Sequence, residues 1–307
     1  MLTWNVLLMQ VLNGLQWGLL LFLLSAGLTL VFGIMNFVNL THGSLYMMGG
    51  YFGAYAYSQT HSFWLACMAA VVGAAIVGVL LDKLVAASLY SRDHLDQVLA
   101  TFGLILIFNE LVRIVWGGNT SVVNPPEILT GSVAVFGLRY PLYRLMIIVV
   151  GLLVSGLLYF IIHRTRIGML IRAGATNTKM VSALGVNIKR LNLIVFAAGA
   201  LLAGLAGVLN APISAIQPGM GEPILILALV VIVTGGIGSI KGAFYGALLI
   251  GMADMVGRAF LPIAMTEFFG RAAAQLTGPA IASMGIYLLM AIVLIARPQG
   301  LFGGRHA

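Results

Sequence analysis

The acidic side chains that could carry chemistry in this sequence are few, and those inside long apolar stretches stand near a basic residue. The chain has 8 Asp and Glu residues, 5 His and 1 Cys. Glu110 lies three residues before Arg113, and Asp254 lies four residues before Arg258. Both spacings place the two side chains on one face of a helix. We therefore expect two local ion pairs, not isolated charges poised for catalysis or proton transfer.

Patterns typical of catalysis and nucleotide binding are missing from the sequence. No Gly-x-x-x-x-Gly-Lys-Ser/Thr phosphate loop occurs. The stretch from Gly236 to Lys241 has the wrong spacing for that loop, and also for the dinucleotide pattern Gly-x-Gly-x-x-Gly. No metal-ligand cluster and no Ser/His/Asp or Cys/His set can be recognised. The sequence therefore predicts a protein that is not an enzyme, binds no metal or cofactor, and does not itself hydrolyse ATP.

The composition indicates which solvent surrounds the elements that carry these residues. The 307-residue chain is 61% hydrophobic and 8% charged, with a mean hydropathy of +1.07. Soluble domains carry about 25% charged residues, so the surface of this chain suits lipid better than water. The net charge of +8 would suggest nucleic acid for a soluble protein. In a membrane protein it indicates basic residues held on the cytoplasmic side, with no nucleic acid.

Nine segments are apolar enough to cross a bilayer, which takes about 20 residues each. They are residues 9–33, 44–60, 63–81, 97–116, 141–162, 191–210, 223–239, 243–262 and 280–296. The second and seventh are the weakest, because they are short and flank Gly-rich breaks. Glu222, beside Pro223, is expected to begin a span. The predicted fold is all-α: one transmembrane helical bundle over residues 1–307, with eight to ten spans and Gly-interrupted helices. Cys67 is expected to face lipid or to pack.

The distribution of basic residues predicts the orientation of the bundle. The segment 163–190 contains six of the sixteen Lys and Arg residues and no Asp or Glu. Such a loop belongs on the cytoplasmic side. Arg297 and Arg305 place the C-terminus on the same side, and nine spans then place the N-terminus outside. The loop 117–140, with Pro125 and Pro126, is expected to be extracytoplasmic and non-helical. The first apolar segment is expected to be retained, because no signal-peptide pattern precedes it.

Two Gly-rich breaks interrupt the apolar pattern in corresponding halves of the chain. The first covers residues 33–43 and the second covers residues 235–242. Paired interruptions of this kind are typical of transporters built from repeats, and ordinary helix–helix turns are the alternative. Backbone freed from a helix cannot face lipid, so it must be buried or line a polar path. We expect a translocation path or its gate beside Asn36, Asn39, Thr41, His42, Gly43, Gly235, Gly236, Gly238 and Ser239. We expect His42 to be structural, with a proton relay as the less favoured alternative.

A short amphipathic helix is predicted from Asn177 to Leu184. Gly185 is well placed to end it in a left-handed conformation. Met180, Val181, Ala183 and Leu184 would form its apolar side. Such a helix could lie on the membrane or dock in a groove of a partner protein. The remaining alternative is a positively charged loop with no partner.

Four motifs in order resemble the permeases of branched-chain amino acid ABC importers, of the LivH type. The first runs from Gly27 to Gly43, and the second joins the stretch from Arg164 to Asn187 with the stretch from Phe196 to Gly207. The third is Gly235-Gly236-Ile237-Gly238-Ser239, and the fourth is Arg297-Pro298-Gln299-Gly300-Leu301-Phe302-Gly303. The resemblance implies that the segment 163–190 couples the chain to an ATPase through Arg172, Ala173, Lys179, Ala183, Leu184 and Gly185. The central loop departs from the fuller coupling motif of other ABC importers, because no Glu precedes Ala183.

The resemblance also implies partners and a substrate class. The chain would pair with a related or identical permease subunit in a bacterial inner membrane. Two cytoplasmic ATPase subunits would use the ATP, and a periplasmic solute-binding protein would deliver branched-chain or similar hydrophobic amino acids. Relatives of this fold import other small solutes, so an amide, urea or an organic acid is an alternative. An ion-coupled secondary carrier is a further alternative, which would need unpaired acids in the membrane.

Small residues recur every four positions in three of the predicted helices. Gly199, Ala203 and Gly207 form one such series. Gly49 with Gly53 and Gly242 with Gly246 form two shorter series. This spacing lets helix backbones approach closely. We expect tight packing there, which could also let helices shift against one another.

Overall fold

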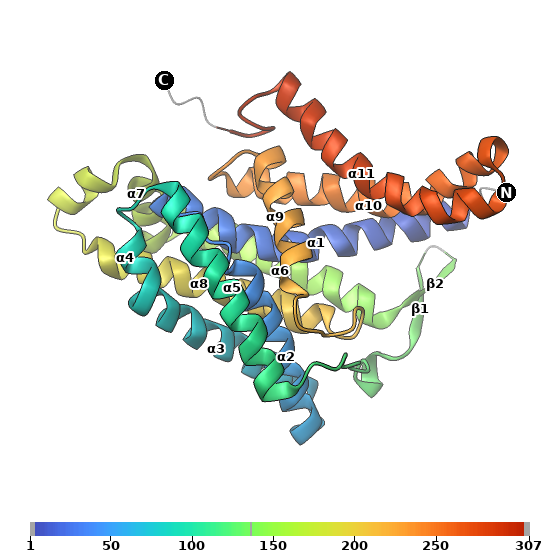
Figure 1. Ribbon diagram of the computed structural model, residues 1–307, viewed down its shortest axis with the longest axis horizontal. Helices are drawn as coiled ribbons and strands as arrows, with labels where there is room; N and C mark the ends of the chain where they lie inside the picture. Colours follow the sequence, from blue (N-terminus) through green and yellow to red (C-terminus); the bar gives the residue numbers. More distant parts are fainter. Residues whose placement is uncertain (1–3, 136, 304–307) are drawn as a thin grey trace. The chain divides into compact units, whose positions relative to one another are not determined.

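The computed structural model describes residues 4–135 and 137–303, and these are mainly helical (Figure 1). The first part holds α1 (Trp4–Met35), α2 (His42–Thr60), α3 (Phe63–Leu81), the π-helical turn η1 (Asp82–Ala86), α4 (Ala87–Leu89) and α5 (His94–Trp116). A 3-10 turn η2 (Glu127–Leu129) and the strands β1 (Ser132–Val135) and β2 (Leu138–Pro141) follow. The second part holds α6 (Leu142–Arg164), α7 (Arg166–Ala183), α8 (Ile188–Asn210), α9 (Gly221–Gly235), α10 (Ile240–Phe269) and α11 (Arg271–Ala296).

Each of the nine segments predicted to cross the membrane overlaps a helix, although α9 ends at Gly235, four residues before the predicted span 223–239 does. The all-α transmembrane fold class is confirmed. In the described part of the chain, seven helices are long and apolar enough to span a bilayer: α1, α3 with its extension to Leu89, α5, α6, α8, α10 and α11. The other two are the segments that looked weakest. Helix α9 is apolar but has only 15 residues, and α2 has 19 residues of lower hydrophobicity.

The chain divides into two compact units, and several helices contribute to both. One unit contains residues 23–126 and 153–228, and the other contains residues 1–22, 127–152 and 229–307. We call them the coupling unit and the C-terminal unit, because the first contains α7, from the segment 163–190 that is expected to couple to an ATPase, and the second contains the end of the chain. Their boundaries fall inside α1, α6 and α9.

Helix α8 is the core of the coupling unit because its small residues admit neighbouring backbones. It packs against α2 and α3. A Cβ on Gly207 would overlap the carbonyl oxygen of Tyr46 in α2, and a Cβ on Gly204 would meet Ala70 and Ala74 of α3. Gly199 lies against Gly27 of α1. The predicted close packing of the Gly199, Ala203 and Gly207 series is therefore confirmed at both of its glycines.

The C-terminal unit uses the same device between α1 and α10. Gly14 and Gly18 of α1 lie against α10, where Gly251 contacts the backbone of Gly18. Phe22 and Phe244 meet edge to face, with ring centroids 5.2 Å apart. Helices α10 and α11 form a packed pair in which Gly278 lies against Pro262.

The described residues of the connection before α6, 117–135 and 137–140, contain no α-helix, as predicted, but they form a hairpin that the sequence pattern did not reveal. Strands β1 and β2 pair antiparallel, with Val133 opposite Tyr140. Tyr140 is buried and its hydroxyl donates to Asn13 Oδ1 at 3.2 Å. Arg144 donates to the same oxygen at 2.7 Å. The first bond fixes the hairpin to α1, and the second fixes the start of α6 to α1, within the C-terminal unit.

Candidate functional site

The first helix break begins where α1 ends, at Asn36. This residue has a φ of 49°, in the left-handed region that Asn tolerates better than most side chains. Its amide still donates to the carbonyl of Phe32 at 2.9 Å, so it closes the last turn of α1. The chain then runs without helical structure until α2 begins at His42. The break predicted near residues 33–43 is therefore present.

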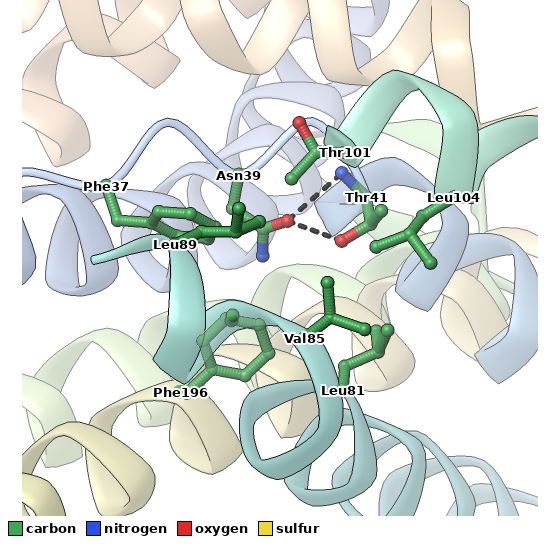
Figure 2. A pocket seen from close by; sticks show the side chains of 10 residues that line it. Phe37, Asn39, Thr41, Leu81, Val85, Leu89, Thr101, Leu104 and Phe196 are labelled. Carbon is green, nitrogen blue, oxygen red and sulfur yellow. Dashed lines mark hydrogen bonds between the residues drawn. The ribbon is translucent and has the colours of Figure 1, made fainter. Parts of the chain in front are cut away.

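Asn39 organises the loop between these helices. Its Oδ1 accepts hydrogen bonds from the amide of Thr41, at 3.1 Å, and from the Thr41 hydroxyl. This side-chain turn replaces the backbone bonds that the loop has lost. Both residues are buried and line a small pocket with Phe37, Thr101 and Phe196 (Figure 2). The centre of a water molecule can occupy about 10 Å³ of this pocket. The pocket therefore has room for about one water.

Gln97 of α5 fastens the same loop, and the sequence analysis did not single it out. Its Oε1 accepts from the amide of Val38 at 3.1 Å. Its Nε2 donates to the carbonyls of Leu89 and Arg92, at 3.2 and 3.1 Å. The side chain is buried. The sequence did contain a signal for this role, which is a Gln in the first turn of an apolar helix. A buried amide must find hydrogen-bond partners for its donors and its acceptor.

His42 is buried at the start of α2, and its bonding fits a structural role. Its Nε2 lies 3.0 Å from the carbonyl oxygen of Leu24 in α1. A carbonyl can only accept, so this nitrogen carries the ring proton. Among the described residues Nδ1 has no hydrogen-bond partner. The neighbouring Gly43 lies against the backbone of Gly221, which lets the starts of α2 and α9 touch.

The second break lies between α9 and α10 in the C-terminal unit. Gly236 and Gly238 have positive φ values of 109° and 78°. Ser239 caps α10, since its Oγ accepts from the amide of Gly242 at 3.1 Å. Gly242 in turn lies against the backbone of Gly235. The break therefore folds into a tight turn that only glycine allows at these positions.

The C-terminal motif closes over this second break. The amides of Leu301 and Phe302 donate to the carbonyls of Thr234 and Gly235, each at 2.9 Å. Gly300, with a φ of 78°, lies against the backbone of Gly236. Phe302 stacks on Tyr245 of α10, with ring centroids 5.0 Å apart. Two motifs about sixty residues apart in the sequence are thus one structural feature, and neither motif by itself indicated the other.

The structure brings the predicted path residues together as two groups. Asn36, Asn39 and Thr41 lie in one loop of the coupling unit, and His42 and Gly43 begin helix α2, which follows this loop. Gly235, Gly236, Gly238 and Ser239 form the turn in the C-terminal unit. Each group is bonded by residues of its own unit: Gln97 accepts from the amide of Val38 beside the first, and the amide of Phe302 donates to the carbonyl of Gly235 in the second.

Helix α7 is longer than predicted. It runs from Arg166 to Ala183, with a non-helical residue at Asn177. The predicted helix from Asn177 corresponds to its second half, and Asn177 Oδ1 accepts from the amide of Met180 at 2.9 Å to start it. The first half was missed, and Thr165 caps it by accepting from the amide of Gly168 at 3.1 Å. A cap before an amphipathic stretch was the signal for this half.

The end of α7 has the geometry predicted at Gly185. This glycine has a φ of 85°. Its amide donates to the carbonyl of Ser182 at 3.0 Å, and the amide of Val186 donates to that of Val181 at 3.3 Å. This pair of bonds is the Schellman arrangement. It satisfies carbonyls that the end of the helix would otherwise leave unpaired.

The predicted coupling residues differ in exposure. Lys179, Ala183, Leu184 and Gly185 are exposed on the last turns of α7 and the residues after it. Ala173 is half-buried. The guanidinium of Arg172 donates to the carbonyl of Ile162 at the end of α6, so this residue fixes α7 to the preceding helix. Leu184 is 77% exposed and Met180 is 60% exposed, so the surface is apolar as well as basic.

Both predicted ion pairs are confirmed, and Glu222 forms a hydrogen bond that the sequence did not predict. Asp254 is buried and accepts from Arg258 at 2.5 Å. Arg113 and Glu110 lie 3.2 Å apart with exposed side chains. Glu222 lies in the first turn of α9, as predicted, and accepts from Asn109 at 2.5 Å.

Two phenols outside the spans are held neutral. Burial raises the pKa of Tyr140, although the nearby Arg144 acts in the opposite direction. Burial also raises the pKa of Tyr90, as do its hydrogen bond to Asp82 and the charge of that carboxylate. Both tyrosines therefore act as hydrogen-bond donors at physiological pH.

Over residues 4–135 and 137–303, no three His, Cys, Asp or Glu side chains gather as metal ligands.

The apolar helices and the two glycine-rich breaks define a multi-pass helical membrane protein. The model of the family described as "Branched-chain amino acid transport system / permease component" matches residues 10–295, and the chain belongs to this family. No solved structure matches the chain.

Individual relatives agree with this assignment. The chain is 28% identical to "High-affinity branched-chain amino acid transport system permease protein BraD" of Pseudomonas aeruginosa, over 96% of this chain and 95% of that protein. It is also 28% identical to the LivH protein of the same description from Escherichia coli, with the same coverage. "Ribose import permease protein RbsC" of Escherichia coli is 26% identical over 76% of this chain and 72% of its own length.

Proposed function

We propose that this chain is the permease subunit of an ABC importer and forms the translocation path for branched-chain or similar hydrophobic amino acids. The observation that carries the proposal is the family match over residues 10–295. It is supported by relatives named as branched-chain amino acid permeases that align with 96% of the chain. The chain would supply the path, while a separate subunit binds and hydrolyses ATP.

The proposed assembly has four kinds of component. A second permease subunit, related or identical, completes the membrane part. Two ATPase subunits bind on the cytoplasmic side, and a periplasmic binding protein delivers the amino acid. The chain lies in a bacterial inner membrane with its C-terminus in the cytoplasm, because the segment 163–190 is rich in Arg and Lys and free of acids. Arg305, which also indicated this orientation, lies outside the described residues.

The ATPase would dock on the end of α7. Met180 and Leu184 expose apolar side chains there, next to the exposed Lys179. A short helix with a fixed end is suited to a groove on a partner protein. Arg172 would hold this helix to α6, so that a movement imposed on α7 reaches a membrane-spanning helix.

The two breaks would line the translocation path or its gate. Each contains backbone that is not part of a helix, which a membrane protein tolerates only when it is buried in protein or faces a polar path. The loop residues Asn36, Asn39, Thr41, His42 and Gly43 would contribute from the coupling unit. The turn residues Gly235, Gly236, Gly238 and Ser239 would contribute from the C-terminal unit.

Two alternatives are tested together with this proposal. The importer could carry another small solute, and the ribose permease relative shows that alignable chains serve different substrates. An ion-coupled carrier would need a free membrane acid, whereas the acids Asp254 and Glu110 have arginine partners. That alternative predicts that Asp254→Ala removes proton dependence while Arg258→Ala leaves transport intact.

The deciding experiment is uptake into liposomes that contain the permease, its ATPase and its binding protein. We expect uptake of leucine that requires ATP inside the vesicle. Uptake of leucine without ATP would reject the importer. Uptake of an amide, urea or an organic acid in place of leucine would retain the importer and correct its substrate.

Docking is tested by the double substitution Met180→Ser and Leu184→Ser. We expect most co-purification of the ATPase to be lost, while membrane insertion is unchanged. Ile128→Ser is the matched control, because Ile128 is 85% exposed in the loop predicted to lie on the opposite side of the membrane. Normal co-purification of the double variant would reject α7 as the docking site.

A further inference from the structure

A groove lies where α3 ends and α8 begins, within the coupling unit. It has a volume of about 460 Å³ and is partly open to the surface. The π-helical turn η1, helix α4 and the residue after it form one wall, and the first turns of α8 with the residue that caps them form the other. The lining residues are Asp82, Lys83, Ala87, Tyr90, Asn187, Lys189, Arg190, Asn192 and Leu193.

The groove carries more positive than negative charge. Lys83, Lys189 and Arg190 are exposed. In the part of the chain that the structure describes, none of the three forms an ion pair. Asp82 is the single lining carboxylate, and it is buried and accepts a hydrogen bond from the Tyr90 hydroxyl.

The backbone adds to this positive character. Helix α8 begins at Ile188 after Asn187, so the positive end of its dipole lies at the groove. The π-helical turn matters as well, because it places Asp82 and Lys83 among the lining residues at the end of α3. Such turns inside α-helices are frequent at functional sites. The combination of three cations, a helix start and a cavity is suited to an anion with several oxygens.

The surroundings of the groove indicate where that anion comes from. Ile76, Leu80 and Leu84 follow one another at four-residue spacing along α3 and η1, and each is more than half exposed. Ile194 and Leu201 are exposed along α8. Apolar side chains are thus exposed along both of the spans whose ends line the groove, and acyl chains would cover them. A soluble partner would not reach that surface, because it lies along helices that are candidate membrane spans.

We propose that the groove binds the phosphate headgroup of an anionic membrane phospholipid, with its acyl chains along α3 and α8. Basic pockets between spans on the cytoplasmic side suit such headgroups. The inference rests on the membrane residence of the chain and is independent of its substrate. The same groove borders the segment that joins α7 to α8, so an occupied groove would stabilise the start of α8 beside the proposed docking helix.

The test measures lipid binding to the full-length chain by native mass spectrometry. The purified protein is mixed with phosphatidylglycerol or with phosphatidylcholine. We expect one phosphatidylglycerol to remain bound in preference to phosphatidylcholine. The triple variant Lys83→Gln, Lys189→Gln, Arg190→Gln should bind it roughly a hundredfold more weakly, because each basic residue near anionic lipid contributes about fivefold.

The matched control removes the same charge elsewhere in the basic segment. Arg164→Gln, Arg166→Gln and Lys179→Gln lie outside the groove lining, and this variant should retain most of the binding. Equal loss in both variants would overturn the proposal, because the effect would then be general surface charge. If the triple variant fails to fold, the single variant Lys83→Gln tests the proposal in its place. It should bind phosphatidylglycerol about fivefold more weakly than the wild type.

Two further arms identify the source of the anion. Inorganic phosphate is added as a competitor, and we expect it to leave the lipid bound. Complete displacement by phosphate, or equal retention of both lipids, would overturn a lipid site. Co-purification of the ATPase is measured on the same triple variant. Loss of the ATPase with unchanged lipid binding would assign the groove to that partner and would likewise overturn the proposal.

Discussion

At the level of single residues, the two ion pairs Asp254–Arg258 and Glu110–Arg113 differ in how deeply the carboxylate is buried. The side chain of Asp254 is 2% exposed, whereas that of Glu110 is 63% exposed. An exposed pair contributes little because water and salt screen it. A buried carboxylate that loses its partner is left as an uncompensated charge. The same arginine substitution should therefore have different consequences at the two sites.

We predict that Arg258→Ala lowers the free energy of unfolding by about 3 kcal/mol, the lower end for a broken buried pair, since Asp254 remains buried without its partner while Arg258 itself is partly exposed. Arg113→Ala is the matched control and should cost less than about 1 kcal/mol. The measurement is thermal unfolding of the full-length protein in detergent. Adding Asp254→Asn to Arg258→Ala should recover much of the loss. Equal effects of the two arginine substitutions would show that burial does not control these pairs.

A second prediction at the level of single residues concerns Gly207. A Cβ at this position would overlap the carbonyl of Tyr46 and approach the amide of Gly50. We expect Gly207→Ala to destabilise the protein by about 1–3 kcal/mol, as overpacking does. Gly156→Ala in α6 is the control, because nothing lies within 4 Å of its Cβ position. It should be neutral or stabilising by up to about 1 kcal/mol, through helix propensity. A stable Gly207→Ala variant would contradict the close approach of α2 and α8.

Among the elements, the sequence predicted most reliably those features that have a local cause. The long apolar helices, the break at Asn36 and the left-handed Gly185 all follow from composition or from single-residue preferences. The first half of α7 and the hairpin of β1 and β2 were missed, because their signals are short. The closure of residues 234–236 by residues 300–302 was also missed. That closure depends on where α11 ends in space, which no local pattern specifies.

The closure of the second break can be tested through hydrogen exchange. Gly300→Ala should strain a residue with a φ of 78° and push its Cβ into the backbone of Gly236. The amides of Leu301 and Phe302 would then lose their bonds to Thr234 and Gly235. We expect their exchange to rise by about tenfold or more, as expected for a strain of about 1.4 kcal/mol or more.

The control for this experiment is Gly285→Ala in α11, where nothing lies within 4 Å of the added Cβ. Exchange at Leu301 and Phe302 should stay at the wild-type rate in that variant. Exchange that is equally slow in all three proteins would mean that the C-terminal motif does not depend on its glycine turn.

At the scale of the whole molecule, the contacts of the first break decide whether α2 takes part in crossing the membrane. Asn36, at the end of α1, lies 3.5 Å from His94 at the start of α5, measured between Nδ2 and Nε2. The amide of Val38 is bonded to Gln97 in that same helix. Helix α1 therefore ends on the side where α5 begins. The extension of α3 ends on that side too, because Tyr90, which follows it, packs on Phe37 with ring centroids 5.2 Å apart. The start of α3, near His61, therefore lies on the other side.

It follows that the chain crosses once between Asn36 and His61. Helix α2 has 19 residues and a length of about 28 Å, close to the apolar thickness of about 30 Å that a bilayer requires. Its modest hydrophobicity is explained by burial of its first half, where Gly43 and Gly49 face α9 and α8 instead of lipid. Composition alone undervalues a span whose neighbours are protein.

Single cysteines test this arrangement in a Cys67→Ala background. We predict that a membrane-impermeant maleimide labels His61→Cys in spheroplasts, in which the plasma membrane is intact, and labels Asn36→Cys only after that membrane is permeabilised. Both positions are exposed in the structure. Labelling of both from the same side would show that α2 does not complete a crossing. The reverse pattern, with Asn36→Cys outside, would preserve the crossing but invert the orientation that the basic segment 163–190 predicts.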